Sequence, residues 1–349
     1  MSDVGEKAFL RNLLPQLEKA DTFLNGFGDD ASIIDIGLPE HAIAFKIDRA
    51  ARPMGAYRGW GGFDTWGRLA VNANVSDLLA VGAVPKGFML SVTVPRTWSV
   101  AQTEAIVRGA VDECERYNIA FLGGDTKEGS EPNVVGAAIG IVDKKKVTGR
   151  KSAQHGEAIV LAGQLGGFAS AYMLLNDEIG TNSSAYVDYV SHPSCAYSEA
   201  TYLFDNFDVS SALDLSDGLW EGLNLLPRQK NSFILELDKL PLHQFALEAA
   251  AIYSMDARNF AFTVGDWAML FTMPQDQASM AISHAPSNYH LSIIGSISRN
   301  VRPVMRSITQ GMQFEMNFDL TNEHFVSRME SEEEYFSKLR SCPILKRLG

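Results

Sequence analysis

Short apolar segments of strand length alternate with longer segments of helical periodicity along this chain of 349 residues. This alternation limits the fold more than any other feature, because it requires helices packed against sheets. The predicted strands are 31–36, 42–47, 88–94, 119–122, 134–142, 158–162, 233–237 and 268–272. The predicted helices are 64–81, 99–117, one that ends at 175, 195–204, one after 217 and 321–339. The alternation predicts an α/β or α+β class.

A charged, glycine-containing stretch with few apolar residues, 144–156, separates the two halves of the chain. Domain boundaries usually fall in such stretches. We therefore predict an N-terminal domain at 1–148, a C-terminal domain at 149–320 and a helical tail at 321–349. Residues 176–194 follow neither a strand nor a helix pattern, so we predict a loop-rich stretch there.

Charge and cysteine content limit the partners and the compartment. The formal net charge is -12, and no run of Lys and Arg forms a basic stripe, which argues against a nucleic-acid partner. The three cysteines are far apart and form no CxxC pair, so we expect neither a zinc site nor a disulfide framework, and a cytoplasmic location fits. We expect no signal peptide and no membrane span, because no apolar stretch is long enough. The acidity is explained either by a solubilising surface or by clustered acids that bind metal.

Aspartates gather beside small or polar residues at the ends of predicted elements. They lie in Gly28-Asp29-Asp30, in Asn72 to Asp77, in Gly123-Gly124-Asp125-Thr126 and in Asp214-Leu215-Ser216-Asp217-Gly218, and Asp48 follows a strand. Each motif alone has a structural interpretation, because Gly-Asp-Asp is a common turn and Asp214 or Asp217 can cap a helix. Five such positions in one chain are hard to explain as turns.

Asp77 is different, because it lies inside a predicted helix among mostly apolar neighbours. Helix interiors disfavour Asp, and a buried carboxylate needs a partner, so this position indicates a partner such as a metal ion. Mg²⁺ takes oxygen ligands and is usually shared between a few carboxylates and substrate phosphates. Phosphoryl transfer depends mainly on positioning and on neutralising the charge that spreads over the transferred group. The aspartates therefore predict an ATP- and Mg²⁺-dependent phosphoryl transfer.

The same segments resemble the thiamine-monophosphate kinase family. The resemblance is carried by Gly28-Asp29-Asp30-Ala31, by Asn-x-Ser-Asp-Leu-x-Ala-x-Gly-Ala-x-Pro from Asn74 to Pro85, by Gly123-Gly124-Asp125-Thr126 and by Asp214-x-Ser-Asp-Gly-Leu ending at Leu219. Gly149-Arg150, followed by Gly156-Glu157, resembles the segment that enters that family's second domain. The chain is thus similar to the superfamily of aminoimidazole ribonucleotide synthetase and selenophosphate synthetase.

The resemblance implies a two-domain PurM-like fold with an α/β C-terminal domain. The N-terminal domains of two subunits would form a β-barrel across a homodimer, and ATP and Mg²⁺ would bind in a cleft together with a small-molecule substrate. The implied metal ligands are Asp29, Asp30, Asp48, Asp77, Asp125, Asp214 and Asp217. The implied nucleotide contacts are Gly124, Asp125, Thr126, Arg150 and Ser216. Asp48, Asp125 and Asp217 are the predicted catalytic residues, with Asp48 as a candidate base.

Two segments depart from the family pattern. Lys46 stands where the kinase has a small hydroxyl residue. Two interpretations stay open, an ammonium that replaces part of the charge of one metal ion and a solvated strand residue. Thr263 to Met269 replaces the family's Gly-Gly-Glu-Asp-Tyr-Glu-Leu, so both Glu positions are lost and only Asp266 and the aromatic Trp267 match. A pocket for a cationic thiazolium ring needs such acids, which argues against thiamine phosphate as the substrate.

Arginines follow the second predicted strand, where the family has a His that meets substrate. Arg49, Arg52 and Arg58 could bind an anionic substrate through bidentate contacts, or they are ordinary surface residues. Arg49, Arg52, Asp266 and Trp267 form the predicted substrate set.

Three functions agree with these patterns. The preferred one is an ATP-dependent kinase that acts on a small molecule. The second is an ATP-dependent ligase or cyclase, which phosphorylates an amide or carbonyl oxygen before a nitrogen displaces phosphate. The third is a nucleotide-binding regulatory protein without turnover. The sequence names no acceptor.

Overall fold

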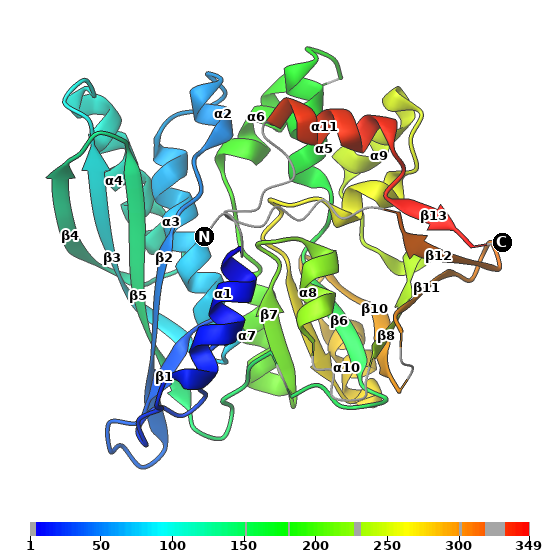
Figure 1. Ribbon diagram of the computed structural model, residues 1–349, viewed down its shortest axis with the longest axis horizontal. Helices are drawn as coiled ribbons and strands as arrows, with labels where there is room; N and C mark the ends of the chain where they lie inside the picture. The colour runs from blue at the N-terminus through cyan, green and yellow to red at the C-terminus, as the bar shows by residue number, and fades with distance from the viewer. Residues whose placement is uncertain are drawn as a thin grey trace.

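Two sheets with their helices make up the protein, as the computed structural model shows (Figure 1). The structure describes residues 5–150, 152–180, 182–226, 232–299, 302–317 and 332–348. The sheet of the N-terminal half lies at the left of Figure 1 and the sheet of the C-terminal half at the right. The mixed α/β class predicted from the alternation is confirmed, whereas the division into domains at residue 148 stays a prediction.

The N-terminal half forms a five-stranded sheet. Across the sheet its strands are β1 (Ser32–Ile34), β2 (His41–Arg49), β5 (Asn133–Asp143), β3 (Val84–Val94) and β4 (Ala120–Glu128). β3 and β4 are parallel and the other neighbours are antiparallel. The described strands of one chain leave this sheet open, so a barrel would need a second subunit.

α3 (Asp64–Ala80) and α4 (Val100–Arg116) pack together against this sheet. The capping box of Ser99 and Gln102 begins α4 where the sequence predicts a helix start. A Cβ on Gly67 would lie 1.9 Å from the Ile106 carbonyl oxygen, and one on Gly109 would lie 2.0 Å from that of Asp64. Glycine at these two positions therefore allows the helix backbones to touch. α3 also contacts β7, so it lies between the two halves.

The C-terminal half forms an eight-stranded sheet in which only β8 and β11 are parallel neighbours. In spatial order the strands are β13 (Leu345–Arg347), β12 (Met312–Met316), β11 (Val304–Ser307), β8 (Ser232–Glu236), β10 (Leu291–Ser298), β6 (Ala158–Ala162), β9 (Met269–Met273) and β7 (Ser211–Asp214). Its helices are α5 (Gly167–Asn176), α6 (Ser183–Ser191), α7 (Tyr197–Asn206), α8 (Leu219–Leu225), α9 (Gln244–Tyr253), α10 (Gln275–His284) and α11 (Glu332–Ser341). Two short helices, α1 (Glu6–Leu13) and α2 (Met54–Tyr57), belong to the N-terminal half.

The fully buried strand β6 separates two hydrophobic cores. Ala158, Val160 and Ala162 contribute to the core that contains α3, α7 and α10. Ile159 and Leu161 contribute to the core that contains α5, α6, α8 and α9. Because successive side chains of a strand point to opposite faces, a continuous apolar run is what a sheet covered on both faces requires.

Residues 176–194 were predicted to be loop-rich, and this is wrong. They contain α6, which begins with the Asn182 side chain accepting a hydrogen bond from the Ala185 amide. One turn apart on this helix, Tyr186 and Val190 are buried and pack into the hydrophobic core of the C-terminal half. The helix is short and capped by a residue that also favours turns, so its sequence pattern is weak.

The strand predicted at 119–122 is longer than expected, because β4 continues to Glu128. Gly123 to Thr126 therefore lie within an edge strand and not beyond its end. Much of the helix predicted at 321–339 lies outside the described residues, since 318–331 are not described. The described tail contains α11 and also β13, which extends the eight-stranded sheet beside β12.

A buried polar network around Asn72 joins the two halves. The Asn72 side-chain amide donates to the Pro193 carbonyl oxygen at 3.0 Å and to Glu113 Oε1 at 3.1 Å. Its oxygen accepts from the Tyr117 hydroxyl at 2.6 Å and from the Cys195 amide at 2.8 Å. A buried side chain with all these bonds fixes α3 and α4 against the chain that leads into α7.

None of the described helices combines the length and the apolar character that crossing a bilayer would require. Cys114, Cys195 and Cys342 are free thiols. A cytoplasmic location stays a prediction.

Candidate functional site

Three of the predicted metal-binding aspartates meet between the two sheets. Asp30 precedes β1, Asp77 lies on α3 and Asp214 ends β7, and carboxylate oxygens of all three lie within 4.8 Å of one another. Their exposed fractions are 2%, 4% and 7%. Buried carboxylates at this separation repel one another and lack water, so the group is stable only with compensating cations. We call these three residues the acid cluster.

Two basic side chains contact the acid cluster. Arg150 forms an ion pair with Asp30, to which its Nε donates at 2.9 Å. Lys46 Nζ, on β2, lies 2.7 Å from Asp77 Oδ2 and 3.7 Å from Asp48 Oδ2. Lys46 is therefore a cation beside the acids, and the solvated-residue interpretation is not supported.

One oxygen of the acid cluster is left without a bond. Asp30 Oδ2 is buried and has no hydrogen-bond partner among the residues that the structure describes. Such an orphaned carboxylate oxygen is unusual in a native protein, and a hard cation is a fitting partner for it. The donor set of Asp30, Asp77 and Asp214 therefore suits Mg²⁺.

The pKa values of Asp77, Asp214 and Lys46 are shifted because these groups are buried close together. Burial, followed by the charge of Asp214, raises the pKa of Asp77 well above its usual range. Burial, followed by the charge of Asp30, raises the pKa of Asp214 to about 6. Burial alone would lower the pKa of Lys46, but Asp77 and Asp48 outweigh it and the pKa lies above its ordinary value, so the ammonium stays charged.

Serine hydroxyls and a backbone amide orient these acids. Ser76, one residue before Asp77, donates to Asp214 Oδ2 at 2.9 Å, and Ser216 donates to Oδ1 at 3.3 Å. The Arg150 backbone amide donates to Asp29 Oδ1 at 3.3 Å. Asp29 and Arg150 thus lie beside the acid cluster, and their implied roles as metal ligand and nucleotide contact stay predictions.

Asp217 is exposed, one residue before the N-cap of α8. That N-cap is Gly218, which makes no side-chain capping bond. Asp217 is therefore not the N-cap residue of α8. Its predicted catalytic and metal-binding roles stay predictions.

Asp125 lies on the face of the N-terminal sheet that α3 does not cover, because β4 contains a bulge. Phe121 pairs with Phe88, but Gly124 pairs with Leu90, so β4 has one extra residue between these pairs. Gly123 takes up the irregularity with a φ of 98°. Directly paired residues share a face. The bulge therefore reverses which face the side chains after Gly123 occupy.

The pairing then separates the predicted ligands. Asp48, Gly136, Leu90 and Gly124 form one row across the sheet, on the face covered by α3. Asp125 pairs with Ser91, in the adjacent row, and therefore points to the uncovered face, where its side chain is 58% exposed. β2 and β4 are also three strand spacings apart, or about 14 Å. Within one chain, Asp125 therefore points away from the acid cluster, whereas Thr126 pairs with Val92 on the face covered by α3 and its nucleotide contact stays a prediction.

The predicted substrate arginines do not form one group. Arg49 occupies the same row and face as Asp125. Arg52 makes an exposed ion pair with Glu131 at 3.0 Å, and Arg58 lies 3.8 Å from Glu333. An anion site built from all three is therefore not supported.

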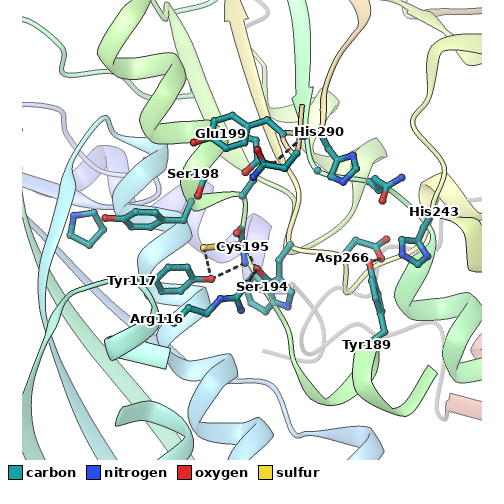
Figure 2. A pocket seen from close by; sticks show the side chains of 18 of the residues that line it. Arg116, Tyr117, Tyr189, Ser194, Cys195, Ser198, Glu199, His243, Asp266 and His290 are labelled. Atoms are coloured by element: carbon teal, nitrogen blue, oxygen red, sulfur yellow. Dashed lines mark hydrogen bonds between the residues drawn. The ribbon is translucent and has the colours of Figure 1, made fainter. Parts of the chain in front are cut away.

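A cavity of about 710 Å³ lies between the two halves. Arg116 and Tyr117 stand on one side of it, and Tyr189, His243 and Asp266 stand on the other (Figure 2). Lys86, Cys195, Glu199, Trp267 and His290 also line it. We call it the seam cavity. Asp266, Trp267 and Pro85 belong to segments that the sequence analysis singled out, whereas most of the other lining residues form no motif and several follow the unrecognised α6.

The seam cavity and the acid cluster lie at the same end of the eight-stranded sheet. Asp214 pairs with Met269, and the Leu215 amide donates to the Ala268 carbonyl oxygen at 2.9 Å. Trp267 therefore lies beside the chain that follows Asp214, one strand spacing away, or about 5 Å between backbones. The cavity and the acid cluster therefore share one end of the sheet, although none of the three acids lines the cavity.

Asp266 already uses its carboxylate within the fold. Oδ2 accepts from the Gly166 amide at 2.6 Å, and Oδ1 accepts from the Phe168 amide at 2.8 Å and from the Tyr189 hydroxyl at 3.3 Å. These bonds satisfy amides at the start of α5. Trp267 follows with a φ of 52°, a left-handed conformation that is rare for a bulky residue. Contact of either residue with substrate stays a prediction.

Comparison with known proteins shows which family and fold this chain resembles. Residues 28–142 match the family model "AIR synthase related protein, N-terminal domain". A thiamine-monophosphate kinase of Bacillus subtilis is 27% identical over 209 residues, which cover 57% of this chain and 62% of the kinase, less than two thirds of its length. A thiamine-monophosphate kinase of Buchnera aphidicola is 27% identical over 277 residues, which cover 78% of this chain and 82% of that protein.

The fold is also that of a solved structure, AaThiL complexed with AMPPCP and TMP. The two structures align with a TM-score of 0.74 and 20% sequence identity, over 88% of this chain and 96% of the other. At this identity the likeness concerns the fold.

Asp266 should make stability depend on pH. Burial raises its pKa to about 6 from 3.8, although the bonds to Phe168 and Gly166 oppose the shift. An acid whose pKa is raised on folding stabilises the fold below its unfolded value, and this stabilisation is lost as pH rises through the folded value. Between pH 4 and 7 the wild type should therefore lose up to about 3 kcal/mol relative to Asp266→Asn.

Urea denaturation of both proteins at several pH values measures this difference. The weaker cap in Asp266→Asn adds a destabilisation that does not vary with pH. A stability difference that stays constant from pH 4 to 7 would show that the carboxylate is not buried in the way described.

Proposed function

We propose that this chain, a thiamine-monophosphate kinase-like member of the aminoimidazole ribonucleotide synthetase superfamily, is an ATP- and Mg²⁺-dependent enzyme that transfers a phosphoryl group to a small molecule. The observation that carries the proposal is the acid cluster, with one carboxylate oxygen unbonded. Buried acids that only stabilised a fold would be paired or replaced by apolar residues. Acids held for a cation and for phosphates explain the arrangement.

The protein's own part in the reaction is positioning. Asp30, Asp77 and Asp214 would hold Mg²⁺, which neutralises the charge that spreads over the transferred phosphoryl group. Ser76 and Ser216 keep the Asp214 carboxylate in place. The charged groups of Lys46 and Arg150 lie where they would face phosphate oxygens. Asp48, partly exposed on β2, would accept the proton of the acceptor.

The seam cavity is the proposed acceptor site. It lies at the same end of the eight-stranded sheet as the acid cluster and contains Lys86, Arg116 and several aromatic side chains. Asp266 is occupied by three hydrogen bonds, and both family Glu positions are absent. The acids that the family places at this segment are therefore absent or already hydrogen-bonded here, which supports an acceptor other than thiamine phosphate. A ligase or cyclase would release phosphate and form a C–N bond, so product analysis separates it from a kinase, whose product keeps the phosphate.

The acid cluster should be required for turnover but not for folding. Asp214→Asn keeps the shape of the side chain and removes one charge that Mg²⁺ needs. We expect ATP consumption, measured with a metabolite panel, to fall by at least about 100-fold, as is common when a charge-stabilising group is lost. The thermal midpoint should stay or rise, because a repelling charge is removed.

Asp276→Asn, on the exposed first turn of α10, is the matched control and should keep full activity. Unchanged turnover in Asp214→Asn would contradict the proposal. Binding of nucleotide by the wild type without turnover on any acceptor would favour the regulatory alternative.

A homodimer would cover the second face of the N-terminal sheet. Ile47, Met89 and Leu122 are 71%, 48% and 55% exposed on the side away from α3. A sheet face exposed to water normally carries polar residues, and an exposed apolar patch marks an interaction surface. Asp125 and Arg49 lie on this same face. We therefore propose that the face closes a two-fold dimer, with Asp125 of each subunit in the interface.

Ile47→Asp tests the dimer. The substitution should leave the fold of a subunit intact, because the side chain is 71% exposed, but it places a charge at the proposed interface. We expect sedimentation analysis to change from twice the subunit mass to the subunit mass. Ile308→Asp, at a position that is 60% exposed on the C-terminal half, should have no effect. A wild type that sediments as a monomer would refute the interface.

A further inference from the structure

We propose that the Lys46 ammonium occupies the place of one divalent cation, so that this chain binds ATP with one metal ion fewer than the same site would bind with a neutral residue at position 46. This inference rests on the proposed function, since it concerns how the acid cluster is loaded. It assigns Lys46 as a positioning residue built into the site.

The position of Lys46 Nζ carries the argument. It lies between two carboxylates from different elements, at 2.7 Å from Asp77 on α3 and 3.7 Å from Asp48 on β2. Lys46 and Asp48 are two residues apart on one strand, so their side chains point to the same face, toward α3. The ammonium therefore fills the space between Asp48 and Asp77, which is where a cation bridging these two acids would have to sit.

Burial makes this more than a surface ion pair. The Lys46 side chain is 21% exposed and that of Asp77 is 6% exposed. Lys46 and Asp30 also border a hollow of about 570 Å³, whose lining includes Ile47, Met89 and Leu122 of the uncovered sheet face. Exposed ion pairs contribute little, but a buried carboxylate that loses a directly bonded cation is strongly destabilised. Moving the Lys46 side chain into solvent would therefore break its ion pair with Asp77 and destabilise the fold.

The charges then divide the acids into two parts. Lys46 holds Asp48 and one oxygen of Asp77. Asp30 and Asp214 are left, together with Asp77, for a metal ion, and Asp30 Oδ2 has no partner among the described residues. An ammonium has three N–H donors, so Lys46 can bond carboxylates and still donate to a phosphate oxygen. The single positive charge of the Lys46 ammonium, which is part of the chain, thereby replaces the double charge of one exchangeable metal ion.

The test counts metal ions in the nucleotide complex. Full-length protein is mixed with AMPPCP and Mn²⁺, and bound Mn²⁺ per subunit is measured by electron paramagnetic resonance. Lys46→Met keeps the length of the side chain and removes its charge, so it should bind one Mn²⁺ more than the wild type. Lys46→Arg should match the wild type. Lys346→Met, at an exposed pair with Glu315, controls for loss of a positive charge.

A second substitution locates the extra ion. In the Lys46→Met background, Asp48→Asn should remove the gained Mn²⁺, whereas Asp48→Asn alone should leave the wild-type count unchanged. Circular dichroism checks that each variant is folded, and Lys46→Thr replaces Lys46→Met if the latter is not.

The outcomes separate this inference from the proposed function. Equal Mn²⁺ counts in the wild type and the neutral variants, with AMPPCP bound to both, would overturn the role of Lys46 and leave the proposed function standing. Failure of the wild type to bind AMPPCP with Mn²⁺ would overturn both.

Discussion

The mutual repulsion of Asp30, Asp77 and Asp214 is the constraint on which the rest of the structure depends. Three carboxylates within 4.8 Å of one another, almost without water, destabilise the fold unless cations lie among them. Arg150 and Lys46 supply two positive charges, and they come from two different segments, the link between the sheets and strand β2. The acids themselves come from both halves of the chain. Joining the halves therefore assembles the site.

The frame that holds these acids together is α3. Its Asn72 bonds the chain before α7, and its Ser76 and Asp77 meet Asp214 and Lys46. Gly67 lets α4 pack directly against it. A helix buried between two sheets cannot shift without breaking these bonds, so the acid cluster is positioned before any ligand arrives. Positioning of this kind is what phosphoryl transfer requires from a protein.

Much of the site could be predicted from residues whose local setting is unusual. Asp77 was informative because a carboxylate in an apolar helix needs a partner. Asp214 was informative because it and Asp217 enclose Leu215 and Ser216, so that two acids lie close together in the sequence. Lys46 was ambiguous, since a strand lysine has no preferred environment. The side to which Asp125 points could not be predicted, because one extra residue at Gly123 reverses the faces of the strand. Asp266 matched the family motif, but only the structure shows that its oxygens hold α5. The short helix α6 and the cavity residues beside it gave no pattern.

The most direct measurement is a crystal structure of the wild type with AMPPCP and Mn²⁺, with anomalous scattering used to locate manganese. The account predicts a manganese peak bounded by Asp30, Asp77 and Asp214, with the triphosphate against it and Lys46 still between Asp77 and Asp48. A nucleotide whose phosphates lie in the seam cavity against Lys86 and Arg116, with no manganese at the acid cluster, would contradict it.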